Sequence, residues 1–141
     1  MTESHPISAI SKLPVRIYYE DTDAGGIVYH ASYIKFAERA RSEFLREWGV
    51  PARSLLPDHQ FQIVVRHLAA DYFAPAYLDD LLNIESCVID LGNASFTMDQ
   101  KITRDGIAIA DLKVVLVCVN TNGKPIRVPD VLRSKIQKGN E

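Results

Sequence analysis

A helical pattern of apolar positions dominates the first half of the chain. Between Ser32 and Trp48, apolar residues recur at spacings of three and four, and charged residues fill the other faces. The apolar positions are Tyr33, Phe36, Ala37, Ala40, Phe44 and Trp48. The pattern predicts an amphipathic helix of about five turns, which Gly49 and Pro51 then end. Since Ala37 and Ala40 are small, we expect the helix to lie close to the layer that covers it.

The rest of the chain shows the two-residue alternation of strands. Before the helix, Val15, Ile17 and Tyr19 alternate with polar or exposed-type residues and predict a strand that runs into the acids at Glu20. After the helix, four longer segments rich in apolar residues predict strands over 61–73, 81–91, 96–103 and 107–119. The dipeptides Gly92-Asn93 and Asp105-Gly106 predict tight hairpin turns between the last three strands.

Three shorter segments complete the predicted secondary structure. One helical turn is expected at 52–56, broken by Pro57-Asp58, and a short C-terminal helix at 129–137. Residues 1–12 are polar and irregular and predict a loosely held tail, followed by a single domain over 13–138.

Together these elements predict an α+β fold. Hairpin-joined strands require an antiparallel sheet, and one apolar helix of this length needs a sheet around it. We therefore expect a curved antiparallel sheet wrapped around one long central helix. The segment Val114–Val119 is continuously apolar and predicts a central strand covered on both faces. The pattern leaves the strand order open.

Composition and charge narrow the function classes. The 141 residues carry 16 basic and 18 acidic side chains, a net charge of −2, so no general field attracts nucleic acid or an anionic membrane. The N-terminus lacks a signal-peptide pattern and no segment is long and apolar enough for membrane insertion, which predicts a cytoplasmic protein. Cys87 and Cys118 lie in strand-like segments without metal-ligand spacing, so we expect buried, reduced thiols, no metal and no cofactor.

The candidate chemistry lies between the first strand and the helix. The segment from Tyr18 to His30 contains Asp21 and Asp23, the pair Gly25-Gly26 and a histidine at the predicted helix start. Glycines permit a sharp turn and a close approach of a ligand to the backbone. By local sequence alone, aspartates beside glycines are most often turn residues, and a histidine at a helix start is often structural.

This segment and its surroundings resemble a known family. Residues 15–33 and 36–41, whose most specific part is DTDAGGIVYH at 21–30, closely resemble the hot-dog-fold acyl-CoA thioesterases related to 4-hydroxybenzoyl-CoA thioesterase, above all the YbgC type. The likeness continues through 72–76, 78–80 and the strand at 114–119. It implies a hot-dog fold with five or six strands around the helix, homodimers or homotetramers, and an active site at the dimer interface.

The resemblance also implies roles for individual residues. Asp23 matches the catalytic carboxylate of the family, as a general base toward water or as a direct nucleophile. Tyr19 and His30 match residues implicated beside it. The residues assigned to substrate binding are Gly25, Gly26, Tyr29 and Ala31. In this interpretation, backbone N–H groups near the helix start polarise the thioester carbonyl.

Other assignments compete with this one. Glu38 is an alternative catalytic acid, because other hot-dog thioesterases carry theirs on the central helix. An exposed ion pair with Arg41 on the solvent side of the helix is the more usual role of such a residue. No Gly-x-Ser-x-Gly motif supports a Ser-His-Asp triad. For the phosphates of coenzyme A, Arg104 and a basic C-terminal set are weak candidates. That set is Lys124, Arg127, Arg133, Lys135 and Lys138.

Two alternatives to acyl-CoA hydrolysis remain open at this level. One is a thioesterase acting on acyl groups carried by acyl carrier protein, which a basic docking patch would favour. The other is a non-catalytic module that binds acyl ligands or partner proteins, for example the Tol-Pal envelope machinery with which YbgC-type proteins are associated. The acyl chain preference cannot be read from the sequence, because the facing of pocket residues depends on strand register.

Overall fold

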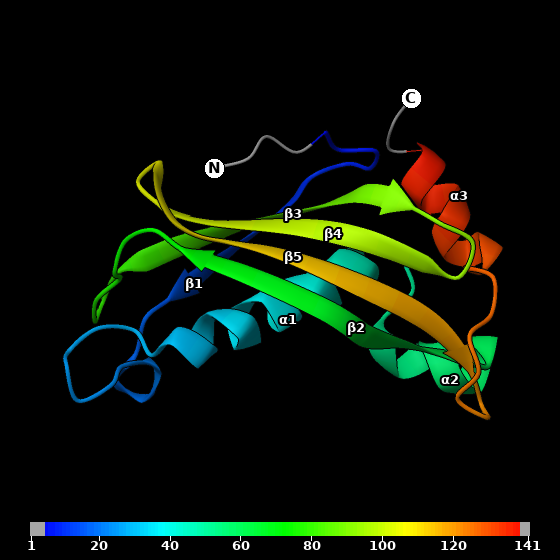
Figure 1. Cartoon of the computed structure of the whole chain (residues 1–141), viewed down its shortest axis with the longest axis horizontal. Coiled ribbons are helices and arrows are strands. Elements are labelled where there is room, and N and C mark those ends of the chain that lie inside the picture. Colours follow the sequence, from blue (N-terminus) through cyan, green and yellow to red (C-terminus); the bar gives the residue numbers. More distant parts are fainter. Residues whose placement is uncertain (1–4, 139–141) are drawn as a thin grey trace.

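A five-stranded antiparallel sheet curves around one long helix in the computed structural model, which describes residues 5–138 (Figure 1). The elements in chain order are β1 (Ser11–Arg16), the 3-10 helix η1 (Tyr19–Asp21), α1 (His30–Glu47), α2 (Ala52–His59), β2 (Phe61–Tyr72), β3 (Leu81–Leu91), β4 (Ser95–Arg104), β5 (Ile107–Asn120) and α3 (Asp130–Lys138). The predicted α+β fold with one central helix is confirmed.

The strand order is β1-β3-β4-β5-β2, and all neighbours are antiparallel. Both predicted hairpins are present. In the β4–β5 turn, Asp105 and Gly106 have φ values of 51° and 79°, the left-handed conformations that a tight hairpin requires. β5 is an interior strand, as the apolar segment Val114–Val119 predicted. β1 and β2 form the two edges.

The small residues of α1 bring the helix close to the sheet. Ala37 and Ala40 are fully buried against it. Between them and the sheet lies the buried amide of Gln100, whose Nε2 donates hydrogen bonds to the Ala37 carbonyl at 2.8 Å and to Ser86 Oγ at 2.9 Å. Because a backbone carbonyl in the middle of α1 is bonded directly to a β4 side chain, the helix is fixed in register along the sheet as well as packed on it.

Irregularities in three strand pairs accompany the curvature of the sheet. The register shifts between Val65 and His67 in β2, between Val88 and Asp90 in β3, and between Ile102 and Thr103 in β4. An extra residue in one strand bends that strand and increases its twist. The shifts therefore help the long strands to curve around α1.

The first strand begins and ends earlier than predicted. β1 ends at Arg16, and Tyr19 lies in η1 instead of continuing the strand, so that part of the prediction was wrong. The cause is local hydrogen bonding, since the Asp21 Oδ2 atom accepts the Tyr18 N–H at 2.8 Å and closes a turn. An acidic side chain that accepts a hydrogen bond from a nearby backbone N–H takes a donor that a strand would use for pairing.

The segment before β1 is bonded to the sheet. The Ile7 N–H donates to the Val88 carbonyl at 2.8 Å, and the Val88 N–H donates to Ser8 Oγ at 2.9 Å. Ser11 Oγ also donates to Glu47 Oε1 at 2.9 Å. Ile7, Ser8 and the first two residues of β1, which all fall within the predicted tail, thus contact β3 or α1. Positions 1–4 lie outside the described residues.

The second helix continues through its proline. The prediction that Pro57 breaks this segment was wrong, since α2 extends to His59. Inside a helix a proline removes one hydrogen bond, and its ring crowds the carbonyl four residues before it, which here belongs to Arg53. α2 accommodates both costs and continues for two residues after Pro57. Gln60 then ends α2 with φ 61° while its N–H bonds to the Leu56 carbonyl at 3.0 Å.

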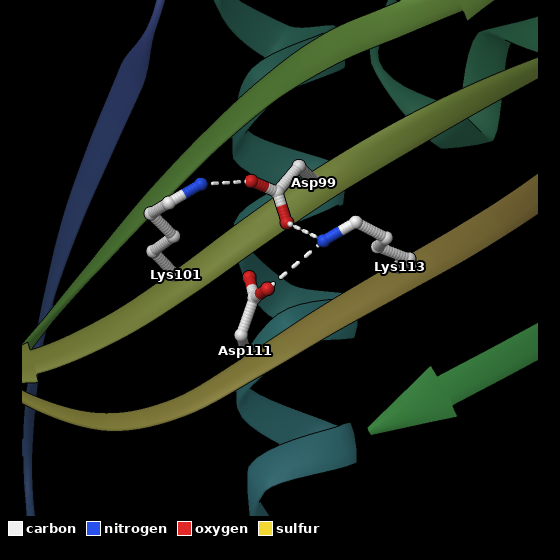
Figure 2. A network of polar contacts seen from close by, with 4 residues as sticks. All are labelled: Asp99, Lys101, Asp111 and Lys113. Atoms are coloured by element: carbon white, nitrogen blue, oxygen red, sulfur yellow. Dashed lines mark hydrogen bonds and ion pairs between the residues drawn. The ribbon is translucent and has the colours of Figure 1, made fainter. Parts of the chain in front are cut away.

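A charged network lies on β4 and β5, on the face of the sheet opposite α1 (Figure 2). Asp99 bonds to Lys101, and the Lys113 ammonium lies 3.4 Å from Asp99 Oδ1 and 2.9 Å from Asp111 Oδ2. Both carboxylates are almost completely buried, whereas the lysines reach solvent. The lysine stems cover the acids, so an exposed sheet face here contains buried charge.

Candidate functional site

The acid-rich segment forms a small hairpin that leads directly into α1. The Tyr29 N–H donates to the Asp21 carbonyl at 2.9 Å, Thr22 and Val28 form a bridge, and the Asp23 N–H donates to the Ile27 carbonyl at 2.9 Å. The tip at residues 24–26 closes this pairing. Asp23 follows Asp21 by two residues. At about 3.3 Å per extended residue, it lies about 7 Å along the hairpin from the Asp21–Tyr29 pair, which is next to the start of α1.

The Asp23 carboxylate is oriented by the glycine turn. Its Oδ1 accepts the Gly25 N–H at 2.8 Å. A Cβ on Gly25 would stand 3.1 Å from that same oxygen, so a glycine there leaves room for the Asp23 carboxylate. Gly26 has φ 83°, a left-handed conformation that glycine adopts without strain. Asp23 is exposed, and within residues 5–138 its Oδ2 has no hydrogen-bond partner. One carboxylate oxygen is thus held and the other faces solvent.

Asp21 has a different part in the same hairpin. Its Oδ2 caps the Tyr18 N–H, and its carbonyl accepts the Tyr29 N–H and, at 3.4 Å, the Ser32 hydroxyl. These bonds hold the loop to the helix start. Asp21 thus acts as a turn and capping residue.

The start of α1 presents unpaired donors. Tyr29, the residue before the helix, supplies no side-chain cap, and its carbonyl accepts the Ser32 N–H at 2.8 Å. Among the described residues, the N–H groups of His30 and Ala31 have no backbone acceptor. They carry the positive end of the helix dipole. The fold therefore places two oriented donors at the end of the hairpin that carries Asp23.

Aromatic side chains surround these donors. The Tyr29 and His30 rings have centroids 4.6 Å apart, and the Tyr72 ring packs edge-on to His30 at 6.3 Å. The Tyr72 hydroxyl donates to the His30 carbonyl at 3.1 Å. Tyr72 was not selected by the sequence reasoning, because a contact across 42 positions depends on the register of β2 and leaves no local signal.

Tyr19 lies apart from this group. Its side chain is 81% exposed, and its contribution to the loop comes from its carbonyl, which accepts the Thr22 N–H and hydroxyl at 3.1 Å and 2.9 Å. Tyr19 thus lies in η1 and not in a strand, and its role beside Asp23 stays a prediction.

A second loop, residues 74–80, supports the hairpin. The Ala76 carbonyl accepts the Val28 N–H at 2.9 Å, and Tyr77 forms a bridge with Ile27. This loop is in turn held by Arg104, whose Nη1 bonds to Asp80 Oδ2 at 2.9 Å and to the Pro75 carbonyl at 3.1 Å. Arg104, a weak candidate for the coenzyme A phosphates, is thus already engaged in holding this loop.

Glu38 stands at a cavity on the other half of α1. A cavity of about 410 Å³ lies between the C-terminal half of α1, α2 and the start of β2. Glu38 is exposed at its edge and accepts a long hydrogen bond from Ser42. Arg41 donates to Gln100 Oε1 at 3.0 Å, and burial lowers its pKa. The ion pair expected between Glu38 and Arg41 is not among the ion pairs within residues 5–138.

The two cysteines are buried, and the described residues form no metal-binding cluster. Cys87 and Cys118 are free and buried, as predicted, and burial raises the pKa of Cys118 to about 11, so its thiol stays protonated. Within the described part of the chain, no group of three or more histidine, cysteine or acidic side chains is arranged to hold a metal ion. No helix there is long and apolar enough to span a membrane.

Comparison with known proteins matches this arrangement to one family. Residues 18–136 match the family described as the thioesterase-like superfamily. "Acyl-CoA thioesterase YbgC" of Haemophilus influenzae is 42% identical over 122 residues, which cover 86% of this chain and 90% of that protein. "Acyl-CoA thioester hydrolase YbgC" of Escherichia coli O157:H7 is 40% identical over 80% of this chain and 84% of its own length.

Solved structures show the same fold. A probable thioesterase from Bartonella henselae superposes with a TM-score of 0.82 at 38% identity, covering 86% of this chain and 100% of that one. The 4-hydroxybenzoyl-CoA thioesterase from Pseudomonas sp. strain CBS-3 superposes with a TM-score of 0.83 at 21% identity, covering 89% of this chain and 99% of that one. The second likeness concerns the fold alone.

Proposed function

Because the chain belongs to the thioesterase-like superfamily, we propose that it hydrolyses acyl-CoA thioesters to a free carboxylic acid and coenzyme A. One observation carries the proposal. The Asp23 carboxylate is held at Oδ1 and open at Oδ2, on the hairpin that ends at the unpaired N–H groups of His30 and Ala31. A carboxylate and an oxyanion site are the two groups that thioester hydrolysis needs. The named activities of the relatives support the substrate class.

The reaction uses these groups in two steps. Asp23 Oδ2 accepts a proton from a water molecule, whose oxygen attacks the thioester carbonyl carbon. The resulting oxyanion accepts hydrogen bonds from the His30 and Ala31 N–H groups, and loss of one such donor raises the barrier by about 3 kcal/mol. The C–S bond then breaks, and the thiolate of coenzyme A takes the proton from Asp23. In the nucleophilic alternative, Oδ2 itself attacks the carbon, the thiolate leaves, and water opens the resulting anhydride.

The aromatic residues at the helix start would support this site. Tyr72 fixes the first carbonyl of α1 and thereby the direction of the neighbouring N–H groups. Tyr29 and His30 present exposed rings beside them, suited to contact the substrate or to orient water. Tyr19, whose side chain is 81% exposed, would be accessible to the substrate.

A homodimer through β2 would complete the site. Within the described residues β2 pairs only with β5, and its free edge carries exposed apolar side chains such as Val65 and Tyr72, which are 49% and 45% exposed. A long apolar edge strand is normally covered, and pairing two copies of one edge gives a closed two-fold dimer. In such a dimer, the start of α1 in one copy would lie near the end of α1 in the other copy. A homotetramer would join two such dimers.

The test is a hydrolysis screen over aliphatic and aromatic acyl-CoAs with matched carboxamide variants. We expect Asp23→Asn to lower kcat by about 10²–10⁴-fold, the usual contribution of a general base. Asp58→Asn, at an exposed position on α2, serves as the control and should keep full activity. Glu38→Gln tests the competing acid. Full activity in Asp23→Asn together with inactivity in Glu38→Gln would contradict the assignment.

The same screen separates the remaining classes. Offering one acyl group on coenzyme A and on acyl carrier protein compares the two carriers directly, and a preference for the carrier protein would replace the proposed substrate. No Asp23-dependent turnover of any substrate would favour the non-catalytic acyl-binding module instead.

A further inference from the structure

The cavity beside α2 is apolar at its far end. The side chains that close this end are Phe44, Leu45 and Trp48 from α1 and Leu55 and Leu56 from α2. The charged and polar residues Glu38, Arg41 and Ser42 line it toward the middle of α1, and Gln62 lines it from the start of β2. A volume of about 410 Å³ lies within the usual range of ligand sites. An apolar end behind a polar mouth suits a ligand with an apolar tail.

The length of the cavity can be compared with an alkyl chain. Glu38 and Trp48 are ten helical positions apart, which corresponds to about 15 Å along the helix axis. An extended alkyl chain built from bonds of about 1.5 Å in zigzag advances about 1.3 Å per methylene. The cavity wall along α1 therefore matches about a dozen carbons.

The position of the cavity fits an acyl chain that enters from a second copy. Asp23 and the cavity lie at opposite ends of α1 in one chain. The two-fold pairing of β2 would bring the start of α1 in the second copy to this end. Ile63, Val64 and Val65 of the edge strand line the cavity and would then lie on the path between the two.

We propose that this cavity holds the distal methylenes of a medium- or long-chain aliphatic acyl-CoA, and that α2 sets the longest chain that is hydrolysed efficiently. This inference rests on the proposed thioesterase function and names its substrate class. Leu55 is buried and anchors α2, whereas Leu56 is 41% exposed and Ala52 is exposed at the cavity end. Small changes at these last two positions alter the far end without opening the core.

The experiment measures kcat/KM for acyl-CoAs of two to eighteen carbons. In the wild type we expect kcat/KM to rise by about fourfold per added methylene while the chain enters the cavity, up to about twelve carbons. Ala52→Phe fills the far end and should lower kcat/KM at least tenfold for the longest good substrates while leaving four-carbon substrates unchanged. Leu56→Ala should extend the range. Arg53→Phe is the matched control, as Arg53 is exposed on the same helix and does not line the cavity.

Failure of this inference differs from failure of the proposed function. If the wild type hydrolyses acyl-CoAs and Ala52→Phe leaves the chain-length profile unchanged, the inference is overturned and the thioesterase proposal stands. If Ala52→Phe changes only the dimer mass, side chains of the second copy fill the cavity and the inference is likewise wrong. If no acyl-CoA is hydrolysed, binding of the fluorescent fatty acid cis-parinaric acid decides: loss of binding in Ala52→Phe but not in Arg53→Phe supports the cavity as an acyl site, and equal binding overturns it.

Discussion

At the scale of single residues, Asp111 is a buried carboxylate on the face of the sheet opposite α1 (Figure 2). Asp111 is 4% exposed, its Oδ2 bonds to Lys113, and its Oδ1 is buried without a hydrogen-bond partner among the described residues. Burial raises the pKa of the Asp111 carboxyl, and the neighbouring Asp99 carboxylate raises it further. The folded protein therefore binds this proton more tightly than the unfolded chain. The stability linked to it is present at low pH and is lost as the pH rises through the folded-state pKa.

Replacing Asp111 by asparagine tests this linkage. In Asp111→Asn the amide N–H can donate toward Asp99 while its oxygen still accepts from Lys113, without a charge to desolvate. We expect the variant to be more stable than the wild type at pH 8, with the difference shrinking as the pH falls and the wild-type carboxyl becomes protonated. Urea unfolding between pH 4 and pH 8 measures it, with Asp58→Asn as an exposed control. A variant less stable than the wild type at pH 8 would refute the assignment.

At the scale of elements, the site depends on two loops that are hydrogen-bonded to each other, the hairpin with Asp23 and the loop over residues 74–80. The hairpin with Asp23 gains its outer hydrogen bonds from residues 76 and 77, and that second loop is held by the ion pair of Arg104 with Asp80. Asp80 Oδ2 also accepts the Tyr77 N–H at 2.8 Å. Arg104, at the end of β4, is thus a positioning residue for a carboxylate that it does not touch.

Loss of the Arg104–Asp80 ion pair should affect kcat more than it affects the stability of the fold. In Arg104→Gln we expect kcat to fall roughly tenfold or more, because small displacements of reacting groups are costly, while the free energy of unfolding falls by only about 1 kcal/mol. Arg104→Lys, which keeps the charge, should recover part of kcat. Arg46→Gln breaks the exposed Arg46–Glu43 pair and is the matched control. Equal kinetics in Arg104→Gln and Arg46→Gln would exclude the positioning role.

At the scale of the whole molecule, the two parts of the proposed site lie toward opposite ends of α1 in one chain. Asp23 and the free N–H groups lie at the start of the helix, and the apolar cavity lies beside its end. The free edge of β2 runs between them with its apolar side chains exposed. In a two-fold dimer paired through β2, the start of α1 in each copy would lie next to the cavity of the other copy, which would complete two sites.

A charge on this edge should separate the subunits. Lysine on an edge strand opposes edge-to-edge pairing, so we expect Val65→Lys to convert a dimer into monomers and to abolish acyl-CoA hydrolysis. Ile107→Lys adds the same charge at an equally exposed apolar position outside β2 and should leave the mass unchanged. Analytical ultracentrifugation gives the masses. A wild type that sediments as a monomer with full activity would contradict assembly through β2.

The sequence by itself determined the features that depend on neighbours along the chain. The helix expected over 32–48 is α1 at His30–Glu47, and the turns at Gly92-Asn93 and Asp105-Gly106 stand where predicted. Period and turn chemistry are local, so they can be read without the fold. Two local predictions were wrong. The Asp21 side chain accepts the Tyr18 N–H where the alternation predicted a strand, and α2 continues through Pro57 where the proline predicted a break.

Only the tertiary structure decided which distant residues meet. The sequence singled out Asp23, His30 and Ala31 through a family likeness, but it did not indicate that Tyr72 bonds to the helix start or that Arg104 braces the supporting loop. Strand order, the free edge of β2 and the cavity beside α2 were equally hidden. Each depends on strand register, where a shift of one residue turns every side chain to the other face. Register is set by the packing of the whole sheet around α1.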